Sequence, residues 1–393
     1  MSPARAEIVV DLAAVRHNVR LLRELTGVTL ISVVKADGYG HGMVPVARAA
    51  REAGADWIAV ATLDEALALR ASGDTGRLLS WLTVPGEDWV AAVEADLDVT
   101  AYSVADLDAI AAAATVTGRR ARVQLKVDTG LNRGGATAAD WPAVVARARA
   151  GVETGSWTVT GTWSHLACAD VPDHPANDAQ EERFRAAVDQ ARAAGLDPGM
   201  LHLANSAAAI LRPSARFDAV RCGIAGYGLD PAPGVPHGTD LRPAMTVRAS
   251  LALVKHVAAG EGVSYGHTWT APAATTIGLV PAGYGEGVPV AGTDRLEVAV
   301  GGRRRPLRGR VCMDQVLVDL GGEEPPEGTE VVLFGPPAAG PTAQEWAEAC
   351  GTINYEIVTR MGGRLTRRYV DTDVPDSTDS TDRTDSTDGE APA

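Results

Sequence analysis

Residues 30–42 read LISVVKADGYGHG, a short apolar run followed by a lysine and then by a turn rich in glycine. The run Leu30–Lys35 is typical of a buried strand, and the closely spaced glycines after it indicate a tight turn. The alanine-rich stretch Met43–Ala53 that follows has the spacing of an amphipathic helix. A strand, a turn and a helix in this order form the repeating unit of an α/β protein with a parallel sheet.

The same unit recurs up to about residue 230. Apolar segments that predict strands lie at Leu30–Lys35, Trp57–Ala61, Leu78–Leu82, Val99–Tyr102, Arg122–Val127, Val159–His165, Met200–Asn205 and Asp218–Cys222. Helical stretches between them include Met43–Ala53, Leu63–Ala71, Val104–Ala114, Trp141–Ala150 and Glu181–Ala194. Eight strands, each with a following helix, predict an α/β fold with a closed TIM-type (β/α)8 barrel rather than an open sheet.

The second half of the chain has a different composition. Residues 231–238, PAPGVPHG, indicate a linker, and the chain beyond it is rich in β-branched residues and turns. Strands are expected at Met245–Val257, Thr276–Leu279, Leu296–Val300, Arg308–Cys312, Val316–Leu320 and Glu330–Leu333, with one helix at Thr342–Cys350. We therefore expect a barrel at residues 11–239 and a smaller C-terminal all-β domain at 240–370. The apolar segment within residues 1–10 is expected to join the sheet of that second domain.

The net charge of −14 over 393 residues is distributed unevenly. Residues 371–393 hold seven Asp, one Glu and one Arg, a charge of −7, and we expect them to form a disordered acidic tail. The remaining chain is only mildly acidic, which argues against nucleic-acid or membrane surfaces as partners. The start of the chain lacks the apolar core of a signal peptide. The four cysteines have no metal-ligand spacing, so we expect reduced thiols, no metal site and a cytoplasmic location.

Lys35 is the most informative single residue of the chain. The sequence has only three lysines, Lys35, Lys126 and Lys255, against 33 arginines. A lysine can lose its proton and attack a carbonyl carbon, whereas an arginine in effect never deprotonates. At the end of a buried strand, desolvation lowers the pKa of an amine toward neutrality. The alternative is an ordinary surface lysine at a strand end, but scarcity and context favour a chemical role.

Other polar residues also cluster where predicted strands end. They are Tyr39, Lys126, Asp128, Arg133, His165, His202, Asn205, Ser206, Arg221 and the glycine-rich run 223–228, GIAGYG. The carboxyl ends of barrel strands open on one face, where the loops after the last two strands often hold a phosphate. Individually, His165 is compatible with a structural role and Asn205 with a helix cap. Together, a reactive lysine facing a phosphate site predicts bound pyridoxal 5'-phosphate.

Nine segments together make the chain similar to a known family. They are Val33–Gly42, Lys126–Arg133, Trp163–Ala167, His202–Ala207, Arg221–Gly228, Val263–His267, Pro281–Gly287, Cys312–Gln315 and Asn354–Val358. Over roughly residues 5–370 they resemble bacterial alanine racemase. The resemblance implies a homodimer of barrel and β-domain subunits that depends on pyridoxal phosphate. It further implies interconversion of L- and D-alanine by two bases, supplying D-alanine for peptidoglycan.

The resemblance also assigns roles to residues. Lys35 would carry the cofactor as a Schiff base and act as one base, and Tyr265 from the partner subunit would act as the other. Arg221 would lie at the pyridine nitrogen, with His165 linking it to Tyr265. The cofactor site would comprise Lys35, Tyr39, Arg133, His165, Asn205, Ser206, Arg221, Gly223, Ile224 and Tyr355. Arg133 and Met313 would bind the substrate carboxylate, and Lys126 stands where many members carry a carbamylated lysine. The segment 285–286, Gly-Glu, departs from the usual Ala-Asp.

Four other functions remain open at this stage. A racemase of broader specificity, acting on serine or other small amino acids, would need nearly the same pocket. A basic-amino-acid decarboxylase would favour a carboxylate at the pyridine nitrogen, and Arg221 argues against it. A non-catalytic pyridoxal-phosphate carrier would not need the second domain with Tyr265 and Met313. A Schiff-base aldolase would not need Arg221 and Tyr355.

Overall fold

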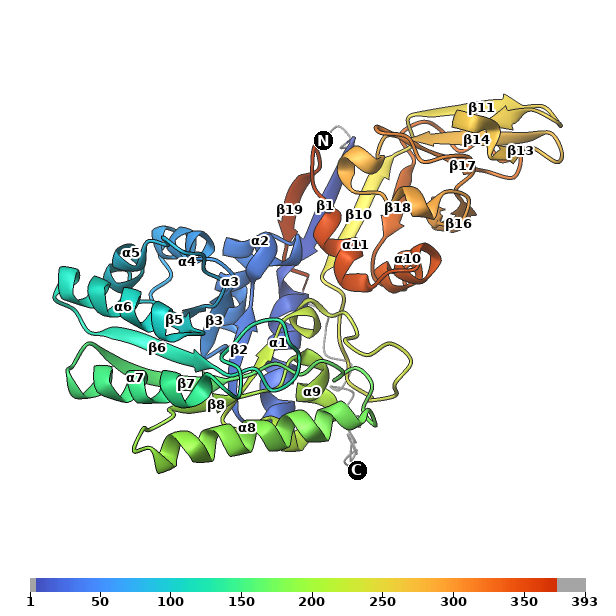
Figure 1. The fold of residues 1–393 in the computed structure, drawn as a ribbon. Coiled ribbons are helices and arrows are strands. Elements are labelled where there is room, and N and C mark those ends of the chain that lie inside the picture. Colours follow the sequence, from blue (N-terminus) through green and yellow to red (C-terminus); the bar gives the residue numbers. More distant parts are fainter. Residues whose placement is uncertain (1–4, 373–393) are drawn as a thin grey trace, which may run out of the picture.

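The computed structural model describes residues 5–372 and contains the predicted closed barrel (Figure 1). Its eight parallel strands are β2 (Thr29–Val33), β3 (Trp57–Val60), β4 (Arg77–Ser80), β5 (Asp98–Ala101), β6 (Ala121–Lys126), β7 (Trp157–Trp163), β8 (Met200–His202) and β9 (Ala219–Cys222). Every residue of β3 is buried, as expected for a strand that faces the barrel interior on one side and helices on the other. The predicted fold class is confirmed.

Helices cover the outside of the barrel. They are α3 (Met43–Glu52), α4 (Leu63–Ala71), α5 (Trp89–Glu94), α6 (Val104–Thr117), α7 (Trp141–Glu153), α8 (Pro175–Ala193) and α9 (Ser206–Leu211). The expectation that each strand is followed by a helix is wrong for β9. Only the short 3-10 turn η2 (Ile224–Tyr227) follows that strand, because the chain then leaves the barrel for the second domain.

The vacant position in the helical layer is filled by α1 (Leu12–Thr26), which precedes the first barrel strand and packs against α3, α9 and η2. Asp11 caps its start by accepting hydrogen bonds from the backbone N–H groups of Ala13 and Ala14. Gly27 ends the helix with a φ of +66°, which glycine adopts readily. Val15, Val19 and Leu22 form its buried face.

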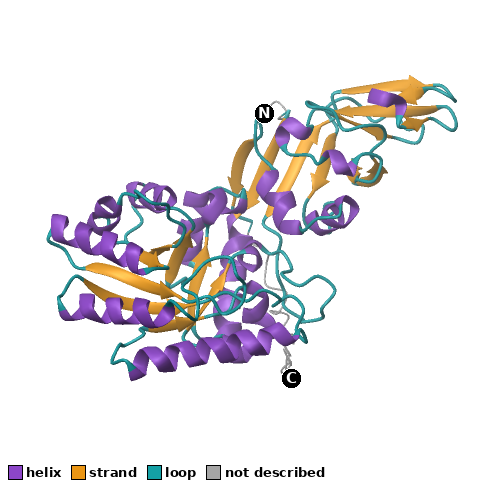
Figure 2. Ribbon diagram, viewed as in Figure 1, coloured by secondary structure: helices purple, strands orange, loops and turns teal. Residues whose placement is uncertain are grey.

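The second domain is built on a six-stranded sheet in the order β16-β15-β18-β10-β1-β19. Figure 2 shows the strands of this domain as orange arrows beside the barrel. Its strands are β16 (Arg303–Pro306), β15 (Glu297–Val300), β18 (Glu330–Phe334), β10 (Met245–Ser250), β1 (Ala6–Asp11) and β19 (Thr366–Val370). The first strand of the chain therefore lies between strands from much later residues, antiparallel to β10 and parallel to β19. Ile8 and Val10 of β1 are fully buried.

Two smaller sheets extend the second domain. One contains β11 (Leu253–Val257), β14 (Thr275–Val280) and β17 (Val316–Asp319), and the other pairs β12 (Gly262–Val263) with β13 (Trp269–Thr270). The sequence predicted a single strand over Met245–Val257, which is wrong. The backbone changes partners in its middle: Leu251 N–H donates to Thr329 O and Ala252 N–H to Leu279 O, in different sheets.

Two further expectations for this domain need correction. Arg308–Cys312 is not a strand, because Gly309 has a φ of +75° and its backbone passes too close to Val263 O to accept a Cβ. The expected helix is α10 (Ala343–Cys350), but a second helix, α11 (Asn354–Arg360), follows it. The domain is therefore a β-domain with two helices.

The described chain continues two residues into the segment predicted to be a disordered tail. Asp371 pairs with Arg16, and Thr372 hydrogen-bonds to Asp11. The rest of that prediction, residues 373–393, lies outside the described residues. No helix within residues 5–372 combines the length and the apolar character needed to cross a bilayer.

Candidate active site

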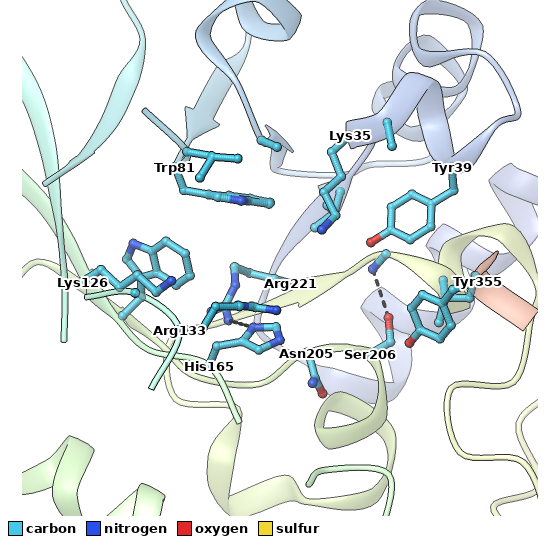
Figure 3. A pocket seen from close by; sticks show the side chains of 18 of the residues that line it. Lys35, Tyr39, Trp81, Lys126, Arg133, His165, Asn205, Ser206, Arg221 and Tyr355 are labelled. Atoms are coloured by element: carbon cyan, nitrogen blue, oxygen red, sulfur yellow. Dashed lines mark hydrogen bonds between the residues drawn. The ribbon is translucent and has the colours of Figure 1, made fainter. Parts of the chain in front are cut away.

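A cavity of about 660 Å³ opens at the carboxyl ends of the barrel strands (Figure 3). Ten of the residues predicted from the sequence line it: Lys35, Tyr39, Arg133, His165, Asn205, Ser206, Arg221, Gly223, Ile224 and Tyr355. Tyr355 belongs to α11, so the second domain also contributes to the cavity. The joint occurrence of polar residues at strand ends therefore predicted a real cluster.

Lys35 begins a short left-handed turn, labelled α2 (Lys35–Tyr39). Ala36, Asp37, Gly38 and Tyr39 have φ values of 52°, 52°, 64° and 53°. Left-handed backbone costs a non-glycine residue roughly 1–2 kcal/mol, so this turn must be held by its surroundings. Glu65 accepts the N–H of Ala36 at 2.7 Å, while Asp37 accepts the N–H of Met43 at 2.9 Å.

The environment of Lys35 favours its neutral amine. Burial lowers the pKa of Lys35, and the nearby Arg133 guanidinium lowers it further, although Glu65 acts in the opposite sense. Its Nζ lies 5.8 Å from the ring centre of Trp81 and 6.0 Å from that of Tyr39. A partly desolvated amine with these neighbours is suited to act as a nucleophile and as a base.

Arg221, in β9, lies at the floor of the cavity in a fixed orientation. Its two terminal nitrogens donate to the carbonyl oxygens of Ser164 (2.7 Å), His202 (3.1 Å) and Leu203 (3.2 Å). The same nitrogens contact Nδ1 of His202 at 2.9 Å and Nδ1 of His165 at 3.1 Å. Burial lowers the pKa of Arg221 to about 9, so the guanidinium remains protonated at neutral pH.

Both histidine partners of Arg221 are neutral acceptors. Burial and the charge of Arg221 lower the pKa of His165 and of His202 well below the ordinary value. Because Arg221 donates to each Nδ1, the proton of each ring lies on Nε2. For His202 this proton points to Gln124 Oε1 at 2.8 Å. For His165 it remains available for a further contact.

The cavity is strongly cationic. Lys35, Lys126, Arg133 and Arg221 all line it, and no carboxylate is among its lining residues. Burial together with Arg221 and Arg133 lowers the pKa of Lys126 to about 8. Arg133 is exposed, and within residues 5–372 it forms no hydrogen bond or ion pair. Such a cavity is suited to a ligand with several negative charges.

One end of the cavity is suited to a phosphate. Ser206 Oγ accepts the N–H of Gly223 at 3.0 Å, at the start of η2. Burial raises the pKa of both Tyr39 and Tyr355, so both hydroxyls stay protonated and can donate. A Cβ on Gly223 would come within 2.3 Å of Tyr39 Oη, so only glycine leaves this space open. Hydroxyls and backbone N–H groups converging on a concave space are typical of phosphate sites.

Tyr265 and Met313 do not reach this cavity in the chain to which they belong. Tyr265 is 69% exposed, in the turn η3 (Tyr265–His267), and Met313 is 54% exposed. The two loops are nevertheless connected, since Ser264 Oγ lies 3.3 Å from Cys312 Sγ. The barrel residues of the predicted site therefore line one cavity, whereas these two residues lie on an outward-facing part of the second domain.

Near Met313, the Gly285-Glu286 departure from the family pattern has its own structural support. Glu286 is fully buried, where it accepts the N–H of Gly283 at 2.9 Å and the Nε–H of Arg364 at 2.5 Å. Arg364 also pairs with Asp314 at 2.7 Å. Glu286 and Arg364 thus join the segment 281–287 to the loop that carries Met313.

Aromatic residues lining the cavity were missed from the sequence. Trp81 and Tyr102 follow β4 and β5, and Trp163 ends β7. Lys126 Nζ lies 4.5 Å from the ring centre of Trp163 and 5.1 Å from that of Tyr102. Their position at strand ends was the available signal, but aromatic residues there are equally typical of a core. No group of three or more potential metal ligands occurs within residues 5–372.

Comparison with known proteins gives the family. The family "Alanine racemase, N-terminal domain" matches residues 10–231, and "Alanine racemase, C-terminal domain" matches residues 244–369. The chain is 53% identical to an alanine racemase of Frankia casuarinae over 370 residues, 93% of this chain and 96% of the relative. The chain belongs to the alanine racemase family.

Solved alanine racemases have the same fold. The enzyme of Streptomyces lavendulae superposes with a TM-score of 0.93 at 49% identity, covering 95% of this chain and 98% of that structure. The enzyme of Streptomyces coelicolor gives a TM-score of 0.92 at 52% identity, covering 94% of this chain and 98% of that structure. The protein is thus an enzyme of the racemase class and, like other alanine racemases, depends on pyridoxal phosphate.

The residues of the cavity fit this cofactor. Lys35 offers a desolvated amine for its aldehyde, and the space beside Gly223 offers donors for its phosphate. Arg221 also lines the cavity, and its Nε–H has no acceptor among residues 5–372. A cavity of this volume, with the Lys35 amine, a phosphate cradle and further cations, is suited to an alanine racemase.

Proposed function

We propose that this protein interconverts L-alanine and D-alanine with two bases, one from each of two subunits. The observation that carries the proposal is the pairing of a desolvated Lys35 with a buried, protonated Arg221 in one cavity. The family relationship supports the same reaction. The cofactor, when bound, supplies an electron sink that makes the α-proton of an attached amino acid acidic.

Lys35 removes or delivers the α-proton on one face of the substrate. Its lowered pKa increases the fraction of neutral amine near neutral pH, and a neutral amine can accept a proton. The left-handed turn fixes its backbone, so the amine returns to one position in each cycle. Racemisation needs a second base on the opposite face, because one fixed amine reaches only one.

Arg221 limits side reactions. It keeps its proton at neutral pH and cannot pass it to the pyridine nitrogen in the way that a carboxylic acid could. With the cofactor bound, Arg221 would leave its ring nitrogen unprotonated, and the cofactor would then withdraw electrons from the α-carbon less strongly. This arrangement disfavours transamination and decarboxylation, and it favours return of a proton to the same carbon.

Arg133 and the phosphate cradle orient the substrate and the cofactor. The guanidinium of Arg133, which has no ion-pair partner within residues 5–372, is suited to bind the substrate carboxylate. Tyr39, Ser206, Gly223, Ile224 and Tyr355 would bind the cofactor phosphate, with Asn205 beside them. Holding both ends keeps the α-carbon within reach of Lys35.

Tyr265 and Met313 of a second subunit complete the site. Three large side chains, Tyr265, Tyr284 and Met313, are exposed on connected loops of the second domain, and their exposure supports contact with another molecule. In the homodimer, Tyr265 of one subunit faces the Nε2–H of His165 in the other. His165 then connects the phenol to the charge of Arg221, which favours the phenolate.

We also infer the cellular role and location from this activity. D-alanine is a building block of peptidoglycan, and the reaction would supply it in the cytoplasm. Free cysteines support a reducing compartment: Cys168, Cys222, Cys312 and Cys350 form no disulfide within the described chain.

The test is the product formed from L-alanine by the purified holoenzyme. We expect D-alanine, measured by loss of circular dichroism and by oxidation with a D-specific oxidase. Release of an amine would indicate a decarboxylase, and no product at all would indicate a carrier protein. Parallel assays with L-serine measure how far the pocket discriminates against a hydroxyl group.

A further inference from the structure

His41 contacts the left-handed turn on the side away from the active-site cavity, which it does not line. Its Nδ1 lies 3.1 Å from Gly38 O and 3.0 Å from Tyr39 O, and the residue is completely buried. Carbonyl oxygens only accept hydrogen bonds, so Nδ1 carries the proton and donates to both. One imidazole thus binds two successive carbonyl groups in the part of the turn that leads into Tyr39.

The remaining nitrogen of His41 stays without a partner. Within residues 5–372, Nε2 has no hydrogen bond, and His41 lines a separate cavity of about 140 Å³ between the barrel and the second domain. Burial lowers the pKa of His41 to about 4, so the ring is neutral at physiological pH. A neutral donor at Nδ1 is therefore its stable form.

An aromatic column connects His41 to the phosphate cradle. The His41 ring lies 4.5 Å from the ring of Tyr227, which lies 4.9 Å from the ring of Tyr39. Tyr227 is itself fixed, because its hydroxyl donates to Val33 O at 3.0 Å. Tyr39 is thus held through its backbone carbonyl and through its ring, and His41 takes part in both.

We propose that His41 is a positioning residue that holds Tyr39 in the orientation required to bind the cofactor phosphate. This inference rests on the proposed function, in which Tyr39 faces that phosphate. His41 is absent from the residues lining the cavity, so its effect must pass through Tyr39. Without the Nδ1–H donor, Tyr39 O would lose this hydrogen bond and Gly38 O would keep the backbone N–H of His41 at 2.9 Å, so the left-handed turn could relax at Tyr39.

The test compares the affinity of the apoenzyme for pyridoxal phosphate with its affinity for pyridoxal, which lacks the phosphate. His41→Phe removes the donor but keeps a ring, and the neighbouring cavity provides room for it. His41→Asn keeps an N–H donor near the position of Nδ1. We expect His41→Phe to weaken binding of pyridoxal phosphate about tenfold, the effect of losing one or two net hydrogen bonds. Binding of pyridoxal should remain unchanged, and His41→Asn should resemble wild type.

Two controls separate positioning from general destabilisation. His256→Phe alters an exposed histidine of β11 and should change neither affinity. In a Tyr39→Phe background, His41→Phe should have little further effect on the ratio of the two affinities. If His41→Phe fails to fold, His41→Asn is compared with His41→Gln, whose longer side chain moves the donor away from Gly38 O and Tyr39 O.

The outcomes discriminate clearly. If His41→Phe weakens the binding of pyridoxal phosphate and pyridoxal equally, or weakens neither, the positioning role is wrong. Wild-type apoenzyme that fails to prefer pyridoxal phosphate over pyridoxal would instead contradict the proposed phosphate cradle. Borohydride reduction provides a readout independent of turnover, because the yield of the labelled Lys35 peptide reports attachment at Lys35.

Discussion

The turn after β2, which carries Lys35, and the turn between β12 and β13, which carries Tyr265, both pass through left-handed backbone. In the first, Ala36, Asp37, Gly38 and Tyr39 all have positive φ. In the second, Ser264, Gly266 and His267 have φ values of 62°, 69° and 44°. Each turn projects one proposed base out of otherwise regular structure.

The two turns differ in what holds them. Both domains hold the Lys35 turn: besides His41, Arg367 of β19 donates to Gly40 O at 2.9 Å and pairs with Asp37 at 3.0 Å. The Tyr265 turn is held by contacts within the second domain alone, such as the hydrogen bond from Ser264 Oγ to Arg310 O at 2.7 Å. The small apolar cluster beside it, Val257, Val263, Ala271 and Ile277, is separate from the main core.

This difference indicates how far each of the two proposed bases depends on dimer formation. The Lys35 turn is complete within one folded chain, whereas Tyr265 is mostly exposed and, in the proposed dimer, would reach the site of the other subunit. Substitutions in the first turn should therefore affect cofactor binding in the subunit that carries them. Substitutions in the second should act on the site of the partner.

The largest effect is expected for Lys35→Ala. Loss of the amine should abolish covalent attachment of the cofactor and lower kcat/KM by at least about 10³-fold, because the anchor and one base are lost together. Borohydride reduction followed by peptide mass analysis should place the cofactor on Lys35 in the wild-type protein. A label on Lys126 or Lys255 would contradict the assignment.

The next effect concerns Tyr265→Ala. Loss of one base should slow α-proton removal from one alanine enantiomer by about 10²–10⁴-fold and leave removal from the other much less affected. Exchange of the α-proton with deuterium, followed for each enantiomer separately, measures this asymmetry. Equal losses for both enantiomers would show that Tyr265 is not the base for a single face.

Mixing the two inactive variants tests whether the site is shared. After subunit exchange, one of the two sites in each mixed dimer holds both Lys35 and Tyr265, so about a quarter of wild-type activity should return. Native mass spectrometry verifies the exchange. If mixed dimers form and no activity appears, Tyr265 acts within its own chain and the comparison of the two turns fails.

A smaller effect is expected of low pH on the free energy of unfolding, through His41 beside the Lys35 turn. The pKa of His41 is about 4 in the folded protein and 6.5 in an unfolded chain. Between these pH values the unfolded chain binds a proton that the folded chain excludes, so the free energy of unfolding falls as pH decreases. The contribution of His41 should be about 3 kcal/mol by pH 4.

His41→Asn removes this titration. Urea unfolding between pH 7.5 and pH 4.5 should therefore show a shallower loss of stability in the variant than in wild type, although His165 and His202 contribute in the same direction. His256→Asn serves as the matched control and should follow the wild-type curve. Parallel curves for wild type and His41→Asn would exclude a buried neutral His41.

The smallest effect is expected far from both turns. Residues 376–393 consist mainly of Asp, Ser and Thr and offer no apolar face for docking. Deleting them should leave turnover and Tm unchanged, which makes the deletion a baseline for the other variants. A clear fall in either quantity would mean that this segment contacts the enzyme body.

The sequence predicted the barrel because its signals are local. Short apolar runs, glycine turns and alanine-rich helices recur in order, and all eight strands were found near their observed positions. Lys35 was identified by its scarcity and its place after a strand. The role of α1 as the missing outer helix was not predicted, because barrel closure depends on contacts distant in sequence.

The remaining parts of the site had weak or no local signal. Trp81 and Trp163 look like core residues until the barrel closes around them. The division of Met245–Val257 between two sheets depends on Thr329 and Leu279, which are remote in sequence. The exposure of Tyr265 could not be deduced from the residues around it in the sequence, since exposure follows from the placement of a whole domain.

The position of β1 has a consequence for how the enzyme is made. This strand leaves the ribosome first, yet its parallel neighbour β19 is among the last segments synthesised. At bacterial elongation rates β1 waits on the order of tens of seconds for that neighbour. The barrel can close during this interval, and β10 can pair with one edge of β1, while the other edge of this apolar strand waits for β19. Completion of the second domain is therefore a post-translational event. A nascent chain interrupted before residue 366 exposes an unpaired, aggregation-prone strand edge that chaperones would need to cover.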